Sequence, residues 1–485
     1  MSTPPPLASG SQGPGALRPL LGTVLDALDE GRRARGGPMP AGGPDAVAAR
    51  LADAVGDVLP DHGDPDALHT LVRALAEGAA DPAEPLCVAH LHCPPLAVAT
   101  AADLAASVLN PSLDSWDQAP AASALEALVT RALAAEVHPG RQGGHARATP
   151  GATVPIPSDA RITPGDTVPT PGDALVTTGG TEANQLALLL ARETCGGGVR
   201  LVCGANAHHS LTRAAWLLGL PDPVVVPAPA GTLDPAALDG ALKSVTGPHL
   251  VAATAGTTDA GLIDPLGEIA GLCRAHGARL HVDAAYGGPL LFSDRRRSLL
   301  DGLAAAHTVT LDLHKLGWQP VAVGLLAVRD PGDLAALHQQ ADYLNADDDT
   351  EAGLPDLLGR SLRTTRRPDI LKVAVTLRTL GRAGLGALVD QVCDRAQEFA
   401  DLVAAHPAFE LYGRPVISTV LFRPAHATDE AVAVVRRRLL TDGRAVLGRA
   451  RADGRVWLKA TLLNPHTRPE DLAALLRTVE GHTAP

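Results

Sequence analysis

The chain has 485 residues, of which 46% are hydrophobic, and this length and composition exclude a disordered or fibrous protein. The formal net charge is -12, with 53 acidic against 41 basic side chains, which argues against nucleic acid as a partner. Aromatic residues make up only 2%, so the core must be built from Ala, Val and Leu. The sequence therefore predicts a large globular protein with an aliphatic core.

The N-terminal part is expected to be helical. The first fifteen residues are rich in Pro, Gly and Ser, a composition typical of disorder. Apolar residues at helical spacing predict a helix over 16–28, the segment 31–45 is interpreted as a loop, and further helices are expected within 46–80. We therefore assign residues 1–95 to an N-terminal helical segment.

The central part of the chain has an α/β pattern. A stretch rich in Pro, Gly and Thr over 139–172 is interpreted as an exposed loop. After it, short apolar runs alternate with helical ones, which predicts a mostly parallel sheet with helices on both faces. The expected strands are 174–177, 200–203, 224–227, 250–254, 279–283 and 308–311.

The C-terminal part changes pattern again. Beyond about residue 368 the sequence predicts long helices, strands over 418–422 and 455–462 that look antiparallel, and a final helix. We therefore divide the rest of the chain into a large α/β domain over 96–370 and a small α+β domain over 371–485.

Cysteine usage and hydropathy bear on the location of the protein. The six cysteines include no CxxC pair, and no signal peptide opens the chain. The longest apolar runs are far shorter than the ~20 residues of a membrane span. We expect a cytoplasmic protein without a membrane partner.

Chemically useful residues follow several of the predicted strands. After the first strand, two glycines precede Thr181, which opens a helix whose free N–H groups suit a phosphate. A Gly-Gly pair before a helix is also an ordinary turn, so this signal alone leaves both interpretations open. After the second strand come His208 and His209; adjacent histidines point apart and no further ligands lie nearby, so we expect no metal site.

Later strands add a hydroxyl, a carboxylate and an amine. Thr258 follows the fourth strand, Asp283 closes the fifth and precedes Ala285, and Lys315 follows the sixth. The carboxyl ends of parallel strands meet at one edge of a sheet, so these groups should lie together. An amine, a carboxylate for a pyridinium nitrogen and a phosphate seat are what pyridoxal 5'-phosphate (PLP) needs. Dinucleotide and nucleoside-triphosphate motifs are missing from the sequence.

Around these residues the sequence resembles the group II PLP-dependent amino acid decarboxylases. The resemblance runs from about residue 86 to the C-terminus. Its most specific strings are AGTTDAGLIDP at 255–265, HVDAAYGG at 281–288, HK at 314–315 and SLRTTRRPDILK at 361–372. It implies PLP fold type I and a homodimer with active sites at the interface.

The resemblance also implies roles for individual residues. Lys315 would form the Schiff base with PLP, Asp283 would bind the pyridine nitrogen, and His208 and Ala285 would lie on opposite faces of the ring. Thr258 would lie near a ring substituent, with Gly180, Thr181 and His314 on the phosphate side.

Tyr343 lies 28 residues after Lys315, counting along the sequence. In the family a tyrosine here belongs to a mobile lid and protonates Cα after CO2 has left. The alternative is an ordinary aromatic residue of a loop.

The substrate class is indicated by the segment 89–126, which resembles the bacterial diamino acid branch of the family. Asp114 stands where aromatic-specific members carry an apolar aromatic side chain, and Asp117 is close by. A carboxylate would pair with a distal ammonium group, although Asp114 could instead cap a turn that faces solvent. We therefore expect decarboxylation of 2,4-diaminobutyrate, lysine or ornithine. The alternatives are an aromatic or acidic substrate, or a PLP-binding partner protein that has lost catalysis.

Overall fold

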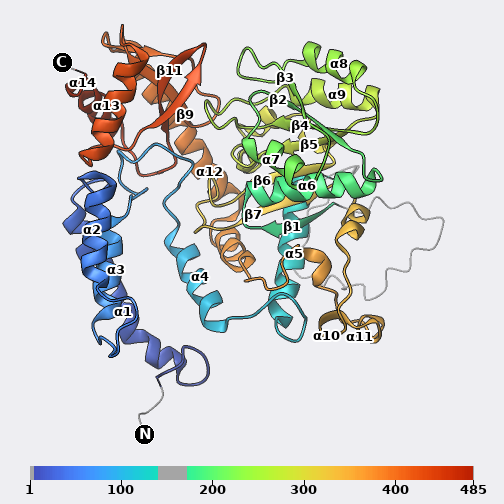
Figure 1. The fold of residues 1–485 in the computed structure, drawn as a ribbon, viewed down its shortest axis with the longest axis horizontal. Helices are drawn as coiled ribbons and strands as arrows, with labels where there is room; N and C mark the ends of the chain where they lie inside the picture. The colour runs from blue at the N-terminus through green and yellow to red at the C-terminus, as the bar shows by residue number, and fades with distance from the viewer. Residues whose placement is uncertain (1–4, 140–171, 484–485) are drawn as a thin grey trace.

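The computed structural model describes residues 5–139 and 172–483 (Figure 1). The loop expected over 139–172 lies outside the described residues except for its two ends. Among the described residues, five helices precede the central sheet. They are α1 (Gly13–Arg35), α2 (Gly43–Val55), α3 (Ala67–Gly78), α4 (Ala97–Leu109) and α5 (Pro120–Val137). Helix α1 begins at Gly13, so residues 13–15, the end of the segment expected to be disordered, are helical.

The loop predicted over 31–45 is wrong at both ends, since α1 continues to Arg35 and α2 begins at Gly43. Tertiary contacts override the local composition here. A Cβ on Gly31 would lie 2.4 Å from the carbonyl oxygen of Arg73, so glycine allows α1 and α3 to approach closely. The Arg35 guanidinium lies 2.7 Å from an Asp81 carboxylate oxygen and stabilises the last turn of α1.

The central sheet has seven strands in the order β1-β7-β6-β5-β4-β2-β3. They are β1 (Asp173–Thr177), β2 (Arg200–Gly204), β3 (Val224–Val226), β4 (His249–Thr254), β5 (Arg279–Asp283), β6 (Thr308–Asp312) and β7 (Gly324–Val328). All strands are parallel except β7, which pairs antiparallel with both β1 and β6. The predicted, mostly parallel sheet is confirmed. The sequence interpretation missed β7, which follows β6 without the helix that separates the parallel strands.

Helices cover both faces of this sheet because its strands are apolar on both sides. Val202 and Val251 belong to the core shared with α5, α8 (Pro235–Ser244), α9 (Leu266–His276) and α12 (Ile370–Ala405). Their neighbours Leu201 and Leu250 pack under α6 (Gly180–Thr194) and α7 (His209–Leu217). Figure 1 shows α6 and α7 lying across one face of the sheet. This arrangement places the carboxyl ends of β1, β2, β4, β5 and β6 on one edge.

The C-terminal part is built on a four-stranded antiparallel sheet of order β10-β11-β9-β8. After the long helix α12 (Ile370–Ala405) come β8 (Phe409–Leu411), β9 (Thr419–Pro424), α13 (Asp429–Thr441), β10 (Gly448–Ala452), β11 (Arg455–Thr461) and α14 (Pro469–Gly481). The strands expected over 418–422 and 455–462 correspond to β9 and β11. Strand β10 was missed because its buried positions, Gly448 and Ala450, are small residues of low strand propensity, although they alternate with exposed arginines.

Two further findings concern the described part of the chain. None of the helices within 5–139 and 172–483 has the length and apolarity needed to cross a bilayer. All six cysteines lie in this part and are free thiols.

Candidate active site

A cavity of about 370 Å³ lies at the carboxyl edge of the central sheet. Its wall is formed by the ends of β1, β4, β5 and β6, the start of α6, the start of α7 and strand β11. Lining it are Thr178, Gly179, Gly180, Thr181, Glu182, Asn184, His208, Thr254, Gly256, Thr258, Asp283, Ala285, Tyr286, Asp312, His314, Lys315 and Lys459, together with His90 and Leu91. The structure thus brings together eight of the residues that the sequence singles out, from five separate segments.

Lys315 lies just beyond β6, and its amine pairs with a carboxylate at the end of the same strand. Its Nζ is 2.8 Å from Oδ2 of Asp312, which is buried. The other carboxylate oxygen of Asp312 has no hydrogen-bond partner among the described residues. Sequence reasoning missed Asp312, although it stands three residues before Lys315 in the string DLHK.

Asp283 is the last residue of β5, and its carboxylate is buried and held from two sides. The backbone N–H of Ala285 donates to Oδ1 at 3.1 Å, and Nδ2 of Asn184 donates to Oδ2 at 2.8 Å. Two N–H donors stabilise a carboxylate in its charged form. Asp283 is therefore suited to pair with a protonated ring nitrogen.

His208 caps the N-terminus of α7, so its ring is fixed by that helix. Ring nitrogen Nδ1 accepts from the backbone N–H of Ser210 at 3.3 Å and lies 2.8 Å from its hydroxyl oxygen. Burial lowers the pKa of His208 below 6.5, which favours the neutral ring. A neutral imidazole at the cavity wall suits stacking on a flat ligand.

The start of α6 forms another side of the cavity. Gly179 has φ +144°, and a Cβ there would lie 2.8 Å from Cε1 of His314. A Cβ on Gly180 would lie 3.1 Å from Cβ of Ala285. These glycines let the helix N-terminus, with Thr181, approach the strand ends closely, as an anion site at a helix N-terminus requires. The His314 ring is held by the Val323 backbone, with Nδ1 2.9 Å from its carbonyl oxygen.

A second lysine closes the cavity from the C-terminal sheet. Lys459 of β11 donates to the carbonyl oxygen of Thr258 at 3.0 Å. Burial lowers the pKa of Lys459 below its usual value, and burial followed by the charge of Lys459 lowers the pKa of His90. Sequence reasoning missed both residues. The available signal was that Lys459 is one of only four lysines in the chain.

Three predicted site residues lie away from this cavity. Tyr343 belongs to the short helix α10 (Asp342–Asn345), and its side chain is 80% exposed. Asp114 lies between α4 and α5 and accepts from Ser112 Oγ at 2.9 Å and from Gln118 Nε2 at 2.7 Å. It is buried and does not face solvent. Asp117 is exposed and accepts from the Ser115 hydroxyl at 2.6 Å.

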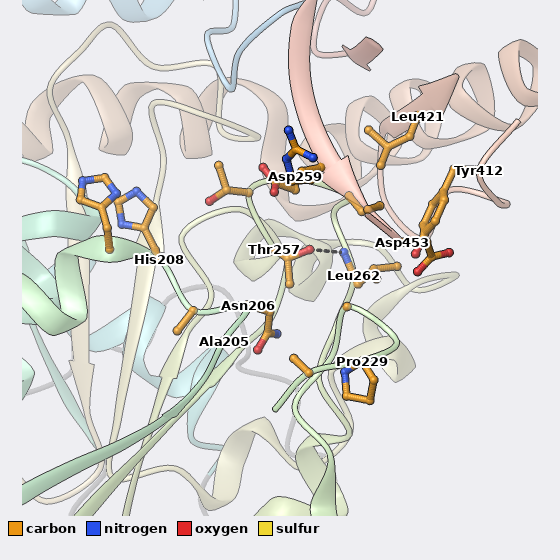
Figure 2. A pocket seen from close by; sticks show the side chains of 18 residues that line it. Ala205, Asn206, His208, Pro229, Thr257, Asp259, Leu262, Tyr412, Leu421 and Asp453 are labelled. Carbon is orange, nitrogen blue, oxygen red and sulfur yellow. Dashed lines mark hydrogen bonds between the residues drawn. The ribbon is translucent and has the colours of Figure 1, made fainter. Parts of the chain in front are cut away.

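A neighbouring cavity of about 490 Å³ shares His208 and Thr258 with the first (Figure 2). The loop around Asn206, the turn around Thr257 and the C-terminal sheet form its walls. In Figure 2 Tyr412 and Asp453 face this turn, which a hydrogen bond of 3.0 Å from the Leu262 N–H to the Thr257 hydroxyl oxygen stabilises. The two cavities therefore adjoin where the strand-end residues meet the C-terminal sheet.

Comparison with known proteins agrees with this arrangement. Residues 57–425 match the model of the pyridoxal-dependent decarboxylase conserved domain. The chain belongs to the pyridoxal-dependent decarboxylase family. It is 39% identical to an L-2,4-diaminobutyrate decarboxylase of Rhizobium meliloti, covering 86% of this chain and 81% of the relative. It is 30% identical to an L-2,4-diaminobutyrate decarboxylase of Acinetobacter baumannii, covering 81% and 79%.

A solved structure shows the same architecture. The glutamate decarboxylase domain of the diaminobutyrate-pyruvate transaminase and L-2,4-diaminobutyrate decarboxylase from Vibrio parahaemolyticus superposes with a TM-score of 0.81 at 29% identity, covering 98% of this chain and 97% of that one. Fold type I is therefore confirmed. So are PLP as the cofactor and amino acid decarboxylation as the class of reaction.

The residues at the cavity fit PLP. An amine, a carboxylate and a helix N-terminus line one space, and the buried Thr254 hydroxyl there has no hydrogen-bond partner among the described residues. When bound, PLP withdraws the electrons left on Cα as CO2 departs. The decarboxylase itself must supply the amine, hold the ring nitrogen and return a proton to Cα.

Proposed function

We propose that this decarboxylase acts on an L-diamino acid, with L-2,4-diaminobutyrate as the first candidate, and releases CO2 and 1,3-diaminopropane. The observation that carries the substrate class is the similarity to the Rhizobium meliloti L-2,4-diaminobutyrate decarboxylase, which extends over most of both chains. Lysine and ornithine belong to the same class, since each carries a distal ammonium group.

The strand-end residues receive the cofactor roles in this proposal. Lys315 supplies the amine that binds PLP covalently, and Asp283 keeps the ring nitrogen protonated. His208 and Ala285 contact the two faces of the ring, and Thr258 lies beside a ring substituent. The phosphate is held by Gly180, Thr181 and His314. Their common position around one cavity supports these assignments.

Tyr343 is proposed as the donor that returns the proton to Cα. A phenol O–H can act as a general acid. The residue is exposed on a short helix with little apolar packing, so a closing motion must bring it to the cavity.

Substrate recognition is assigned to Asp114 and Asp117, acting from the second subunit of a homodimer. Neither lines the cavity of its own chain, so the role needs another copy. The side chains of Leu109 and Trp116, which flank Asp114, are 70% and 41% exposed. Such exposed apolar groups favour a surface that another subunit covers. We further propose a cytoplasmic location, which the six free thiols support.

One observation favours a second candidate, decarboxylation of an acidic amino acid. The amine of Lys459 lies in the cavity wall and would pair with a carboxylate of such a substrate. A relative from Aliivibrio fischeri named aspartate 1-decarboxylase is 28% identical over 58% of this chain.

A panel of amino acids tests the proposal. CO2 and amine are measured with 2,4-diaminobutyrate, ornithine, lysine, aspartate, glutamate and tyrosine, with Lys315→Ala as the inactive control. We expect a diamino acid to give the highest kcat/KM. Highest activity with glutamate, aspartate or tyrosine would overturn the diamino assignment and leave decarboxylation intact. PLP bound at Lys315 without CO2 from any amino acid would instead indicate a binding protein that has lost catalysis.

A further inference from the structure

A chain of buried hydrogen bonds runs beneath the cavity and centres on Asn184, in the first turns of α6. Its side-chain amide nitrogen donates to Oδ2 of Asp283 at 2.8 Å and to the Ser210 hydroxyl at 2.9 Å. Its carbonyl oxygen accepts from the Thr310 hydroxyl at 2.8 Å and from Nε2 of His281 at 3.0 Å. Every hydrogen-bonding position of this amide is therefore occupied.

The orientation of the amide follows from the chemistry of its neighbours. A carboxylate can only accept, so the NH2 group of Asn184 must face Asp283. The carbonyl oxygen then faces Thr310 and His281. Burial lowers the pKa of His281 to about 4, so its ring is neutral and its single N–H donates to Asn184. The other ring nitrogen lies 2.9 Å from the Thr308 hydroxyl, which donates to it.

The Asn184 amide also determines the direction of the hydrogen bond between Ser210 and His208. The Ser210 hydroxyl oxygen accepts from Asn184, so its hydrogen is free for Nδ1 of His208 at 2.8 Å. The Ser210 backbone N–H can only donate, and it also points at Nδ1. Nδ1 therefore accepts, and in the neutral ring the proton resides on Nε2.

We propose that Asn184 is a positioning residue that sets two groups at once: it fixes the Asp283 carboxylate for the PLP ring nitrogen and holds His208 in the tautomer with its proton on Nε2. Thr310, below the sheet edge and outside the cavity lining, orients Asn184 in turn. The inference rests on the roles proposed for Asp283 and His208. It goes beyond them because neither Thr310 nor Ser210 lines the cavity.

The sharpest variants are Thr310→Val and Thr310→Ser. Valine keeps the shape of threonine and removes only the hydroxyl donor, whereas serine keeps the hydroxyl. Without the Thr310 hydroxyl, the buried Asn184 carbonyl oxygen loses a donor, and the side chain of Asn184 is held less firmly. We expect Thr310→Val to raise the PLP dissociation constant of the apoenzyme about three- to tenfold and to shift the visible absorption band of bound PLP. Thr310→Ser should restore both.

Asn184→Leu removes the whole amide and should have the larger effect, about tenfold or more on PLP affinity. Gln185→Ala, on the same helix but outside the cavity lining, is the matched control and should bind PLP like the wild type. In apoenzyme with 15N-labelled histidine, the His208 ring should give a protonated Nε2 and an unprotonated Nδ1. Asn184→Leu should lower the share of this tautomer, since the longer bond from the Ser210 backbone N–H, at 3.3 Å, is then the remaining contact that requires it. A His208→Gln variant assigns the signals.

These variants distinguish failure of the positioning role of Asn184 from failure of the cofactor role proposed for Asp283. If Asp283→Asn alters PLP affinity and absorption but Thr310→Val and Asn184→Leu do not, the positioning role is wrong. It is also wrong if Thr310→Ser behaves like Thr310→Val, or if Asn184→Leu leaves the His208 tautomer unchanged. If Asp283→Asn itself changes neither the PLP affinity nor the absorption of bound PLP, the cofactor role of Asp283 is wrong, and the positioning role of Asn184 is wrong as well. Should Asn184→Leu fail to fold, the Thr310 pair still decides.

Discussion

The rim of the central sheet and the two segments that carry Asp114 and Tyr343 differ in how they hold their side chains. At the rim, Asp283 ends a strand and Lys315 follows one, and both side chains have hydrogen-bond or ion-pair partners within 3.1 Å. Among the described residues, Asp114 instead forms hydrogen bonds within its own loop, and Tyr343 is largely exposed. The residues proposed to hold the cofactor thus line one cavity of a single chain, whereas those proposed for substrate selection and proton return lie outside that cavity.

The difference has a physical basis. Strand ends are held by a ladder of hydrogen bonds and packing on both faces, which keeps catalytic side chains in place. A surface loop and a short helix can instead adapt to a substrate or to another subunit. Variants of the rim should therefore abolish chemistry, and variants of the outlying segments should change its outcome.

The largest effect is expected for Lys315→Ala, since Lys315 is the proposed covalent attachment point for PLP and Lys459, the other lysine of the cavity, is hydrogen-bonded to the Thr258 carbonyl oxygen. Turnover should fall below detection while the thermal unfolding midpoint stays near that of the wild type. Borohydride reduction and peptide mapping should label Lys315 in the wild type. Label on Lys243, an exposed lysine paired with Asp239, would contradict the assignment.

Asp283→Asn should come next. The ring nitrogen would lose its charged partner, and we expect kcat to fall about 100-fold or more while PLP still binds. The measurement is single-turnover CO2 release by the PLP-loaded variant. A wild-type rate would show that the carboxylate does not assist the chemistry.

Tyr343→Phe should leave CO2 release possible and slow the return of the proton to Cα, with kcat lower by about 100-fold. In air, part of the product should be aldehyde and ammonia instead of amine. Amine and aldehyde are quantified together by chromatography. An unchanged amine yield without aldehyde would refute the role of Tyr343.

The smallest effect is expected for Asp114→Asn. The preference for 2,4-diaminobutyrate over glutamate, measured as the ratio of kcat/KM values, should fall about tenfold or more because the distal ammonium loses its charged partner. Ser112→Ala removes only a hydrogen bond to Asp114 and serves as the control. Equal losses in both variants would mean that the carboxylate acts by holding its loop.

The sequence predicted those parts of the fold and site that depend on short stretches of chain. Asp283 and Lys315 could be placed together because the strand-end rule needs only the position of each strand. Asn184 and Lys459 were missed because their contacts join residues 99 and 201 positions apart and depend on how elements pack. The same limit explains the wrong loop over 31–45, where contact with α3 rather than local composition decides the structure.

The most direct test of the central contrast uses mixed dimers. Lys315→Ala and Asp114→Asn chains are coexpressed with different tags, and the dimer carrying both is purified. If Asp114 acts on the cavity of the other subunit, one site of this dimer combines an intact Lys315 with an intact Asp114. The ratio of kcat/KM for 2,4-diaminobutyrate to that for glutamate should then equal the wild-type ratio. A ratio as low as that of the Asp114→Asn homodimer would show that Asp114 acts within its own chain, and would contradict the account.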